Sequence, residues 1–409
     1  MLPEPSFTFT IPSVYDDTTL DCRVYNPPHN VLNATEFHEQ WHPRGAIIAH
    51  PYALLGGCYD DGVVLSAAAE IHKQGFVVGT FNFRGAGSSG GSTSWQAKPE
   101  IDDFVSFVGF FVHYVEGLRE STPQSPSQRT FASKLSPVIS AYDTTLAPIA
   151  PETVGMTLIL GGYSYGALIN IHLPAPDVIL QRFESAAKGT AEAEIRLRAV
   201  SLAVQWNRDA EIHREARQAR RTGSHEKMRP TARSMAVAMG GDESEPGSRR
   251  PSHESGRSLD AVRRSLDKGR RKLGLRRHGS DMPEEAMIEE SLTSMKIPPP
   301  QTHYLLISPL LSLVTAFVTM FSSSIRANTL QGEEKICISP TLAVYGDRDI
   351  FTSQKRYRRW AEGLAVKPGS HFQFREVAGA GHFYHEDGVE TELRCCIREW
   401  VQEMRGCST

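Results

Sequence analysis

The segment GYSYG at positions 162–166 constrains the fold of this chain more than any other part of its sequence. It follows a short apolar run, Thr157 to Leu160, and precedes a run of helical character, Ala167 to His172. A serine on such a sharp strand-to-helix turn holds strained dihedral angles, and side chains at the two flanking positions would collide with neighbouring backbone, which explains the glycines. The turn lifts a hydroxyl above the edge of a sheet, so Ser164 is the candidate nucleophile.

The rest of the chain alternates short apolar runs, rich in β-branched and aromatic residues, with longer helical patterns. This alternation predicts an α/β fold with a mostly parallel central sheet flanked by helices. Ser6 to Pro12 and Leu20 to Tyr25 alternate apolar and polar residues, as an antiparallel edge hairpin does. The other predicted strands are Ala46–Ala49, Phe76–Phe83, Thr157–Leu160, His303–Ile307, Thr341–Tyr345 and Phe372–Val377, and the longer predicted helices are Val63–Gln74, Ile101–Arg119 and Val389–Met404.

A serine nucleophile needs a base, and the base needs an acid that orients it. In an open α/β sheet these groups lie in loops at the carboxyl ends of strands. Two carboxylates, Asp347 and Asp349, follow the predicted strand that ends at Tyr345. Asp349 falls where a turn would project its carboxylate over the sheet edge and is the favoured acid. Asp347 is the rival, expected to cap that turn or to pair with Arg348.

The favoured base is His382, which follows the last predicted strand after the glycine-rich run 378–381. That run lets the loop fold back toward Ser164. His371 and His385 are rivals, but His371 precedes the strand and so lies at its wrong end. His385 is interpreted as a solvated loop residue or a group on the substrate side. The chain order Ser, Asp, His, each after a strand, favours His382.

Two backbone amides are expected to hold a developing oxyanion. The N–H of Tyr165 lies at a helix N-terminus directly after the serine. The second donor should come from the loop after the third strand, where the sequence reads His50-Pro51-Tyr52. Because proline has no amide hydrogen, the N–H of Tyr52 is the predicted donor. His50 is expected to shape the loop by hydrogen bonding.

Residues 85–90 spell a G-x-G-x-x-G motif directly after the strand Phe76–Phe83. A dinucleotide site requires a helix that opens at the glycines and an acidic residue at the end of a second strand. Here the loop continues to Pro99, and Asp102 and Asp103 begin a helix instead. The motif is therefore interpreted as a tight turn beside the crevice, and neither a cofactor nor a metal is predicted.

Taken together, these motifs resemble the α/β-hydrolase superfamily. They are His50-Pro51, the run NFRGAGS at 82–88, the GYSYG segment, Gly346-Asp347-Arg348-Asp349 and Gly381-His382. The asparagine-phenylalanine-arginine-glycine stretch is similar to that of a small intracellular serine hydrolase branch. The resemblance covers residues 1–175 and 300–409 and implies the α/β-hydrolase fold with hydrolysis of esters, thioesters or amides. Family members often carry His-Gly at the oxyanion loop, where this chain has Pro51.

Composition divides the chain unevenly. The net charge of −3 is the sum of +9 between Arg208 and Arg277, where 19 Lys and Arg meet 10 Asp and Glu, and −12 elsewhere. We predict a hydrolase core in two parts, 1–205 with an irregular excursion at 121–154, and 301–409. Between them lies a basic, Ser/Arg-rich insertion, 206–300, expected to be mostly disordered because it has too few apolar residues to form a core. Its flanks, Leu173–Trp206 and Pro309–Arg326, are expected to form a small cap.

The basic insertion suggests a regulatory partner. Arginines precede Ser252, Ser265 and Ser280, a pattern that basophilic protein kinases favour, and each phosphorylation would subtract roughly 1.5–2 charges. A solvated tether without a role is the equal alternative. A nucleic-acid partner is not expected, because aromatic residues are not interleaved with the basic ones.

Bulk features favour a cytoplasmic protein with reduced thiols. The six cysteines are scattered without a C-x-x-C pair, and the start lacks the basic and apolar regions of a signal peptide. The uncharged stretch 304–321 nearly reaches transmembrane length, but Pro309 divides it and four Ser and Thr residues interrupt it. It is interpreted as a buried strand followed by an apolar helix and not as an integral membrane span, with a peripheral membrane contact as the alternative.

The sequence thus predicts a serine hydrolase that cleaves a small carboxylic ester or thioester through an acyl-enzyme. Ser164 would be the nucleophile, His382 the base and Asp349 the orienting acid, with the amides of Tyr52 and Tyr165 as oxyanion donors. The alternative is a non-hydrolytic binding or regulatory protein on the same fold, with the basic insertion as a phosphorylated interaction segment.

Overall fold

The computed structural model describes residues 1–27, 43–94, 97–119, 155–184, 186–223, 297–311 and 323–406. Its strands are β1 (Phe7–Pro12), β2 (Thr19–Tyr25), β3 (Arg44–Ala49), β4 (Val77–Phe81), β5 (Thr157–Tyr163), β6 (Gln301–Ile307), β7 (Thr341–Gly346) and β8 (Phe372–Val377). Its helices are η1 (Ala53–Leu55), α2 (Gly62–Lys73), α3 (Lys98–Arg119), α5 (Tyr165–His172), α6 (Pro176–Glu184), α7 (Ala191–Gly223), α11 (Ser323–Ile338), α12 (Gln354–Ala365) and α13 (Val389–Gly406).

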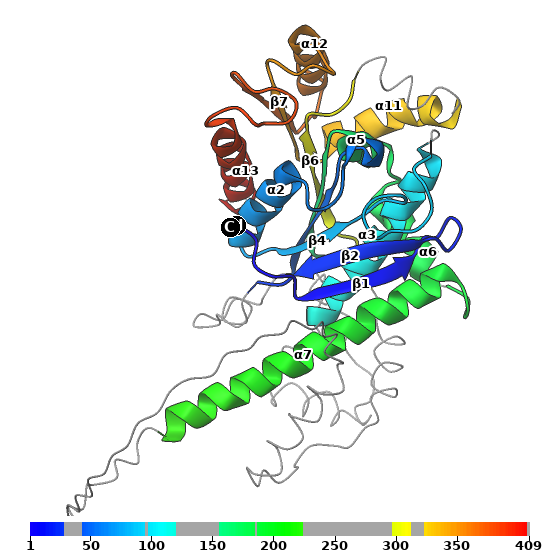
Figure 1. Ribbon diagram of the computed structural model, residues 1–409, viewed down its shortest axis with the longest axis vertical. Helices are drawn as coiled ribbons and strands as arrows, with labels where there is room; N and C mark the ends of the chain where they lie inside the picture. The colour runs from blue at the N-terminus through cyan, green and yellow to red at the C-terminus, as the bar shows by residue number, and fades with distance from the viewer. Residues whose placement is uncertain are drawn as a thin grey trace, which may run out of the picture. The chain divides into compact units, whose positions relative to one another are not determined.

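The strands form one eight-stranded sheet in the order β1-β2-β4-β3-β5-β6-β7-β8. Figure 1 shows β1, β2 and β4 side by side. β1 pairs antiparallel with β2, and β2 pairs antiparallel with β4, so the N-terminal hairpin forms one edge. The neighbours from β4 to β8 are all parallel. The carboxyl ends of these six strands therefore share one edge of the sheet, and the loops that follow them meet there.

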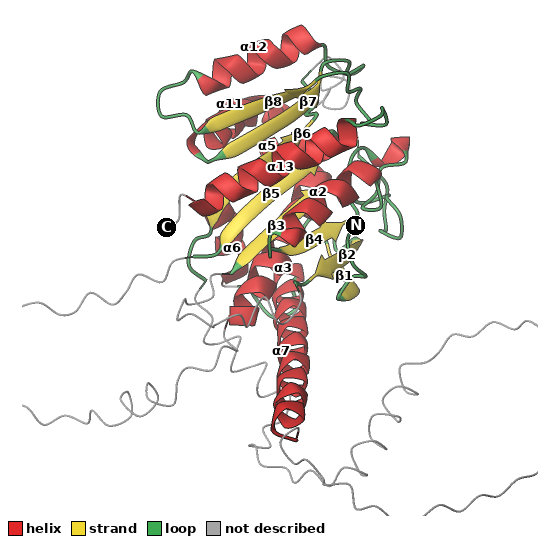
Figure 2. Ribbon diagram, turned by 90° about the vertical axis from the view of Figure 1, so that its left-hand side faces the viewer, coloured by secondary structure: helices red, strands yellow, loops and turns green. Residues whose placement is uncertain are grey.

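Helices cover both faces of the sheet (Figure 2). α2 and α13 pack on one face, and α3, α5, α6, α11 and α12 contribute to the core on the other. Consecutive residues of one strand supply both cores: in β3, Ala46 and Ile48 face α2, whereas Ile47 and Ala49 belong to the opposite cluster. This alternation follows from the period of two along a strand. A parallel sheet buried on both faces requires such uniformly apolar strands.

The predicted fold class is confirmed: the chain has the α/β-hydrolase fold, with a mostly parallel sheet between helices. Each strand predicted from the sequence is present, with its ends moved by a few residues. β4 ends at Phe81, two residues before the predicted end, because Asn82 and Phe83 already belong to the loop. The helices α6, α11 and α12 were not predicted.

The two boundaries predicted between the core and the insertion, after residues 205 and 300, lie in described parts of the chain. The first falls inside α7, so residues 206–223 of the predicted insertion are helical, and the second directly precedes β6. The chain divides into two compact units, residues 1–213 with 288–409, and Arg214–Met287. Of the second unit the structure describes residues 214–223, which continue α7. The excursion at 121–154, most of the insertion 206–300, and the serines Ser252, Ser265 and Ser280 lie outside the described residues, so their predicted disorder and phosphorylation stay predictions.

Half of the predicted cap can be located. In the segment Leu173–Trp206, α6 packs on α3, where the Phe183 ring lies against Gly109, and Arg182 forms a 3.0 Å ion pair with Asp102. These contacts run along a helix that flanks the sheet. The other half, Pro309–Arg326, includes residues 312–322 outside the described part, so the cap stays a prediction.

The uncharged stretch at 304–321 begins as the predicted buried strand, because its first four residues belong to β6. The helix predicted to follow falls mainly on residues 312–322, outside the described part of the chain. Among the helices that the structure does describe, none combines the length and apolar composition needed to cross a membrane.

Candidate active site

Ser164 occupies the turn between β5 and α5, as the GYSYG segment predicts. Its backbone has φ 55° and ψ −111°, a conformation that residues with a side chain rarely adopt. The Ser164 N–H donates a 2.8 Å hydrogen bond to the carbonyl of Ile307, at the end of the neighbouring strand β6. The sheet therefore holds the strained turn in place.

The two glycines of the segment are required by close backbone contacts. A Cβ atom at Gly162 would lie 2.4 Å from the backbone of Gly166, on the first turn of α5. A Cβ atom at Gly166 would lie 2.5 Å from the carbonyl oxygen of Ala49, at the end of β3. Both distances are too short for any side chain, so α5 can start this close to the sheet only with glycine at both positions.

The three side chains predicted as a triad lie in one hydrogen-bonded chain. His382 Nε2 lies 2.8 Å from Ser164 Oγ, and His382 Nδ1 lies 2.6 Å from Asp349 Oδ2. All three residues are buried. Since an ionised carboxylate only accepts hydrogen bonds, the Nδ1–H donates to Asp349 and leaves Nε2 free to accept the serine proton. The arrangement can activate a hydroxyl for attack on a carbonyl carbon.

Asp349 is held as an ionised acceptor. Its Oδ1 accepts backbone hydrogen bonds from Phe351 (2.8 Å) and Thr352 (3.0 Å), and its Oδ2 accepts one from the Tyr357 hydroxyl (3.1 Å). Burial alone would raise the pKa of this carboxyl, but the hydrogen bond and charge of His382 and the two amides outweigh it. The pKa of Asp349 is therefore lowered.

The rival residues lie elsewhere. Asp347 Oδ1 accepts a 2.7 Å hydrogen bond from the N–H of Gly379, so this carboxylate fixes the turn between the acid loop and the histidine loop. His371 lies just before β8, at the opposite edge of the sheet from Ser164. His385 is exposed, and its ring stacks on Phe383 at 5.8 Å.

Tyr163, directly before the serine, holds the histidine loop. Its hydroxyl donates a 2.9 Å hydrogen bond to the carbonyl oxygen of His382, and the two rings lie 5.5 Å apart. The Phe351 ring contacts the other side of the imidazole edge-on, with ring centres 4.5 Å apart. Tyr163 adjoins Ser164 in the sequence, but no sequence pattern indicates its contact with His382.

A second tyrosine fixes the loop from the side of the sheet. The Tyr384 hydroxyl lies 3.2 Å from Ser308 Oγ and donates to the carbonyl of Val344 at 3.3 Å. Tyr384 and Ser308 both have positive φ angles, 53° and 42°. These contacts join the loop after β8 to β7 and to the residue that follows β6.

The predicted oxyanion donors lie on adjacent segments. Tyr165 is the first residue of α5, where N–H groups have no acceptor within the helix, and Tyr52 caps η1 in the loop after β3. The rings of Tyr52 and Tyr165 pack edge-on with centres 5.1 Å apart. Both backbone N–H groups therefore belong to the edge of the sheet that carries Ser164, and their role as oxyanion donors stays a prediction.

His50 shapes the oxyanion loop, as the sequence led us to expect. Its Nε2 accepts a 2.9 Å hydrogen bond from the N–H of Phe83, and its Nδ1 lies 2.6 Å from the carbonyl oxygen of Pro51. The amide donor fixes the tautomer, so Nδ1 carries the proton. Burial lowers the pKa of His50 to about 4, which keeps the ring neutral.

The G-x-G-x-x-G segment forms the predicted tight turn. Gly85 and Gly87 have φ angles of 74° and 52°, and α3 starts only at Lys98. The residues before the turn carry the structural contacts: Asn82 Oδ1 accepts the N–H of Tyr59 at 2.8 Å. Arg84 and Asp103 form a buried ion pair at 2.7 Å. The NFRG stretch therefore anchors this loop to the segment that follows β3 and to α3.

Two tyrosine hydroxyls beside the elbow, those of Tyr52 and Tyr165, are buried and have no hydrogen-bond partner among the residues that the structure describes. Burial, with the nearby carboxylate of Glu100, raises the pKa of Tyr165 well above its ordinary value. An unpaired buried hydroxyl costs free energy, so these two groups are the least satisfied polar atoms of the site.

The far end of α5 is held by a half-buried lysine. Lys335 Nζ donates to the carbonyl oxygens of Asn170 (3.1 Å) and Leu173 (2.8 Å) and lies 5.0 Å from the centre of the Tyr304 ring. A cation at the C-terminus of a helix is favourable. Burial lowers the pKa of Lys335 to about 7. α5 is thus fixed at both ends, and Ser164 with it.

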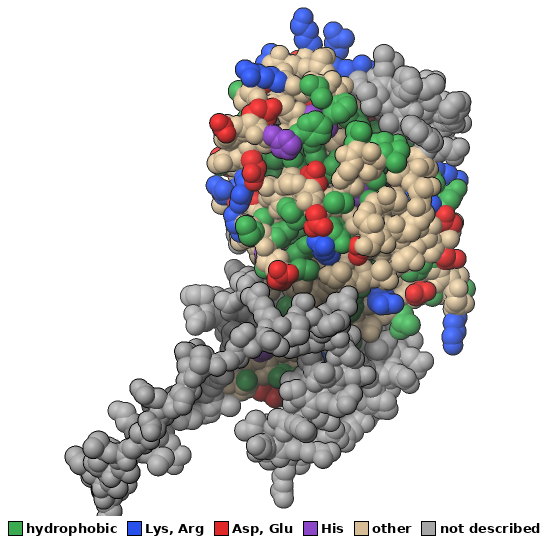
Figure 3. All heavy atoms as spheres, viewed as in Figure 1, with side chains coloured by type: hydrophobic (Ala, Val, Ile, Leu, Met, Phe, Trp, Pro, Cys, Tyr) green, Lys and Arg blue, Asp and Glu red, His purple; other side chains and the backbone are tan. Residues whose placement is uncertain are grey.

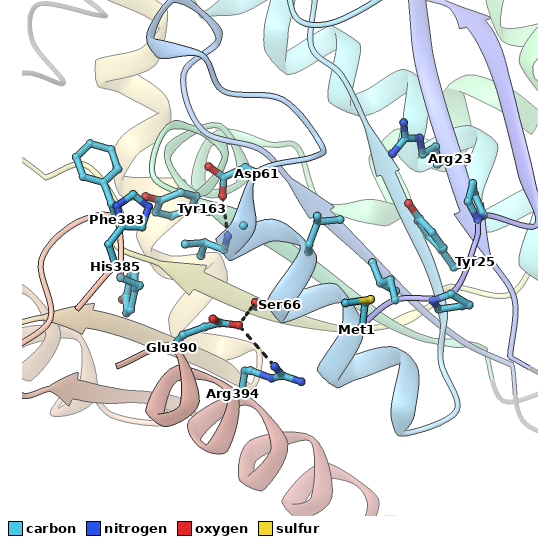
Figure 4. Close-up of a pocket in the computed structure, with 18 of the residues that line it drawn as sticks. Met1, Arg23, Tyr25, Asp61, Ser66, Tyr163, Phe383, His385, Glu390 and Arg394 are labelled. Atoms are coloured by element: carbon cyan, nitrogen blue, oxygen red, sulfur yellow. Dashed lines mark hydrogen bonds and ion pairs between the residues drawn. The ribbon is translucent and has the colours of Figure 1, made fainter. Parts of the chain in front are cut away.

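A cavity of about 650 Å³ borders the histidine loop on the side of α2 and α13 (Figure 4). Tyr163, Tyr384 and His385 line it, together with the N-terminal residues 1–5. Three of its polar lining residues pair with one another: the Ser66 hydroxyl donates to Glu390, which also lies 3.5 Å from Arg394. In the described part of the chain, no three His, Cys, Asp or Glu side chains gather as a metal site would require.

No protein-family model matches the sequence, and no curated protein matches it. Among solved structures, an α/β serine hydrolase without a lid from Xanthomonas campestris is similar at 15% identity, over 99% of this chain and 97% of that chain, with a TM-score of 0.44. An α/β serine hydrolase homologue from Coxiella burnetii is similar at 14% identity, over 98% and 99%, with a TM-score of 0.42. The fold assignment rests on the strand order and connections of this chain, and the site on its own geometry.

Proposed function

We propose that this chain is a serine hydrolase that cleaves a carboxylic ester or a thioester through an acyl-enzyme. The observation that carries the proposal is the chain of two short hydrogen bonds, 2.8 Å from Ser164 Oγ to His382 Nε2 and 2.6 Å from His382 Nδ1 to Asp349. A nucleophile, a base and an orienting acid in this sequence are the groups that acyl transfer requires.

In the first half of the reaction, Ser164 Oγ attacks the carbonyl carbon as His382 Nε2 takes its proton. Asp349 accepts the Nδ1–H, fixes the tautomer and stabilises the imidazolium that forms. The oxyanion of the tetrahedral intermediate accepts hydrogen bonds from the amides of Tyr52 and Tyr165. When the intermediate collapses, the bond from carbon to the leaving oxygen or sulfur breaks, and His382 gives its proton to the leaving alcohol or thiol.

In the second half, water attacks the acyl-enzyme and His382 takes its proton. The bond between the acyl carbon and Ser164 Oγ then breaks, the proton returns to the serine, and the carboxylic acid leaves. Tyr163 acts on this cycle indirectly, because its hydrogen bond fixes the backbone of His382. Neither half requires a metal or a cofactor as a reactant.

The alternative, a non-hydrolytic binding or regulatory protein, depends on the insertion 206–300. Most of that segment lies outside the described residues, and no contact of the described residues favours the alternative. It differs from the proposal in one measurable respect, because it predicts a folded protein without turnover.

The experiment compares wild type with Ser164→Ala and with Ser201→Ala, a matched serine on α7 that takes no part in the proposed chemistry. Hydrolysis is measured on aryl esters and on thioesters of increasing acyl length. The proposal predicts turnover by wild type and Ser201→Ala, and a loss of more than about a thousandfold in kcat for Ser164→Ala. Wild-type protein that is folded but turns over none of these substrates would favour the alternative.

A further inference from the structure

Three loops at the carboxyl edge of the sheet carry exposed apolar side chains. Leu54 and Leu55 are 60% and 71% exposed in the loop after β3, Ile350 is 75% exposed after β7, and Phe383 is 45% exposed after β8. We call these four residues the apolar rim. The same three loops carry Tyr52, Asp349 and His382, so the rim belongs to the segments that build the proposed active site.

The strand order distributes the rim on two sides of Ser164. β3 lies on one side of β5, and β6, β7 and β8 follow on the other. Because neighbouring strands are about 4.8 Å apart, the leucines after β3 and the residues after β7 and β8 flank the serine at distances of a few strand widths. A surface that contacted the rim would thus face the nucleophile.

Cations adjoin the rim. Arg348 precedes Asp349, and Lys355, Arg356 and Arg359 lie in the first two turns of α12; all four are exposed. Arg358 is paired with Glu376, whereas none of the other four forms an ion pair with a described residue. Figure 3 shows Lys and Arg side chains gathered at the end of the molecule formed by α12, with hydrophobic side chains beside them on the same face.

Folding does not explain these cations. The first turn of α12 contains no acidic residue, although the helix dipole favours acids there and disfavours cations. The chain outside Arg208–Arg277 carries an excess of acidic residues, 37 against 25 Lys and Arg, so the patch also runs against the charge of its surroundings. Cations held in an unfavourable place beside exposed apolar side chains indicate an external anionic partner.

We propose that the apolar rim and the four cations dock this protein on an anionic lipid bilayer, with the rim inserted at the headgroup boundary. Apolar side chains beside cations are the combination that binds such interfaces. Resting on the proposed hydrolase function, this assigns the substrate class: an acyl ester or thioester whose acyl chain reaches Ser164 from the membrane. A soluble anion would be bound by the cations alone and would leave the rim without a role.

The test uses the full-length chain with Ser164→Ala, so that binding is read without turnover. Its sedimentation with vesicles of phosphatidylcholine alone is compared with vesicles that also contain phosphatidylserine. We expect binding to the anionic vesicles only, weakened by added salt because exposed charges are screened. Lys355→Glu with Arg356→Glu should weaken binding by at least about tenfold, and Leu55→Ser with Ile350→Ser by a similar factor.

Matched controls come from surfaces away from the rim. Val366→Ser removes an apolar side chain that is 79% exposed at the far end of α12, and Lys188→Glu reverses an exposed charge before α7. Both should bind vesicles like the parent, and each variant is first shown to keep the parent's thermal unfolding. The proposal is overturned if neither vesicle binds, if both bind equally, or if the rim and cation variants bind like the controls.

The two proposals fail separately. Hydrolysis of a water-soluble short-chain ester by wild type reports on the proposed function, and vesicle binding by Ser164→Ala reports on docking. Binding without hydrolysis would overturn the hydrolase and leave the docking surface, and hydrolysis without binding would do the reverse.

Discussion

The hydroxyl of Tyr163 donates a 2.9 Å hydrogen bond to the carbonyl oxygen of His382, a residue 219 positions later in the chain. Tyr163 is the last residue of β5, and the next residue is Ser164. The strand that positions the proposed nucleophile therefore also holds the loop of the proposed base. Because the end of β5 contacts both residues, it sets the distance between Ser164 and His382, which would otherwise depend on two separate loops.

The two tyrosines beside the serine should respond oppositely to the loss of their hydroxyls. Tyr163→Phe removes a bond to His382, so we expect a loss of about 1–2 kcal/mol of stability and a lower kcat with little change in KM. Tyr165→Phe removes a buried hydroxyl without a partner, so stability should be unchanged or higher by up to about 1 kcal/mol. Denaturant unfolding and steady-state kinetics test both, and equal effects of the two variants would contradict the assignment.

Replacing the two carboxylates of the loop after β7, Asp347 and Asp349, should have different effects on kcat. Asp349→Asn removes the ionised acceptor of His382 Nδ1, and we expect kcat to fall by about 10⁴ because the imidazole loses its correct tautomer. Asp347→Asn keeps an acceptor for the Gly379 amide and should leave kcat near the wild-type value. If the larger loss followed the change at Asp347, the orienting acid would be wrongly assigned.

Replacing glycine by alanine should lower the stability of the protein at one position and raise it at another. Gly166→Ala places a Cβ atom 2.5 Å from the carbonyl oxygen of Ala49, so we expect a loss of about 2–4 kcal/mol or failure to fold. Gly363→Ala adds a Cβ atom with nothing within 4 Å in the interior of α12, and it should stabilise the protein by about 0.5–1 kcal/mol. Chemical denaturation measures both, and a stable, active Gly166→Ala would refute the close approach of α5 to β3.

Buried histidines should make the fold sensitive to mild acid. Burial lowers the pKa of His303 from 6.5 to about 4, and its Nδ1 has no hydrogen-bond partner in the described part of the chain. Between these values the unfolded chain binds a proton that the folded chain does not, so stability is complete above about pH 6.5 and falls as the pH is lowered toward 4.

His303→Phe should reduce the loss of stability at low pH. It should not abolish it, because His50 and His113 also have pKa values lowered to about 4 and remain in the variant. The measurement is the melting temperature of both proteins between about pH 7.5 and pH 4.5. A wild-type melting temperature that is constant over this range, or an equal decline in wild type and variant, would show that His303 does not carry the effect.

The sequence was sufficient for the fold and for the grouping of Ser164, Asp349 and His382, because each of these residues follows a segment that the sequence predicts as a strand. The carboxyl ends of parallel strands share an edge, so the order of strands and polar residues alone brings these groups together. The spacing of the two glycines predicted the turn at Ser164. A Cβ atom at Gly162 or Gly166 would lie 2.4–2.5 Å from backbone atoms, so only glycine is tolerated there. The sequence favoured Asp349 over Asp347 as the orienting acid, and the hydrogen bonds of the two carboxylates distinguish them: Asp349 contacts His382, whereas Asp347 accepts from the N–H of Gly379.

Contacts between distant segments could not be read from the sequence. Tyr163 with His382, His50 with Phe83, and Lys335 at the end of α5 depend on how loops pack in three dimensions. α12 was missed because its first half, QKRYRR, resembles a charged loop, and only Tyr357, Ala361 and Leu364 mark a buried face. Their spacing of three to four residues was the available signal.

The most direct test of the acyl-enzyme is covalent labelling by a fluorophosphonate, with the modified residue located by peptide mass spectrometry. A fluorophosphonate forms a bond from phosphorus to the activated serine oxygen as fluoride leaves. We predict one adduct, on Ser164, in wild type and in Ser201→Ala, and none in Ser164→Ala, with hydrolysis lost in parallel. Labelling at another residue, or wild-type hydrolysis by Ser164→Ala, would contradict the proposed function.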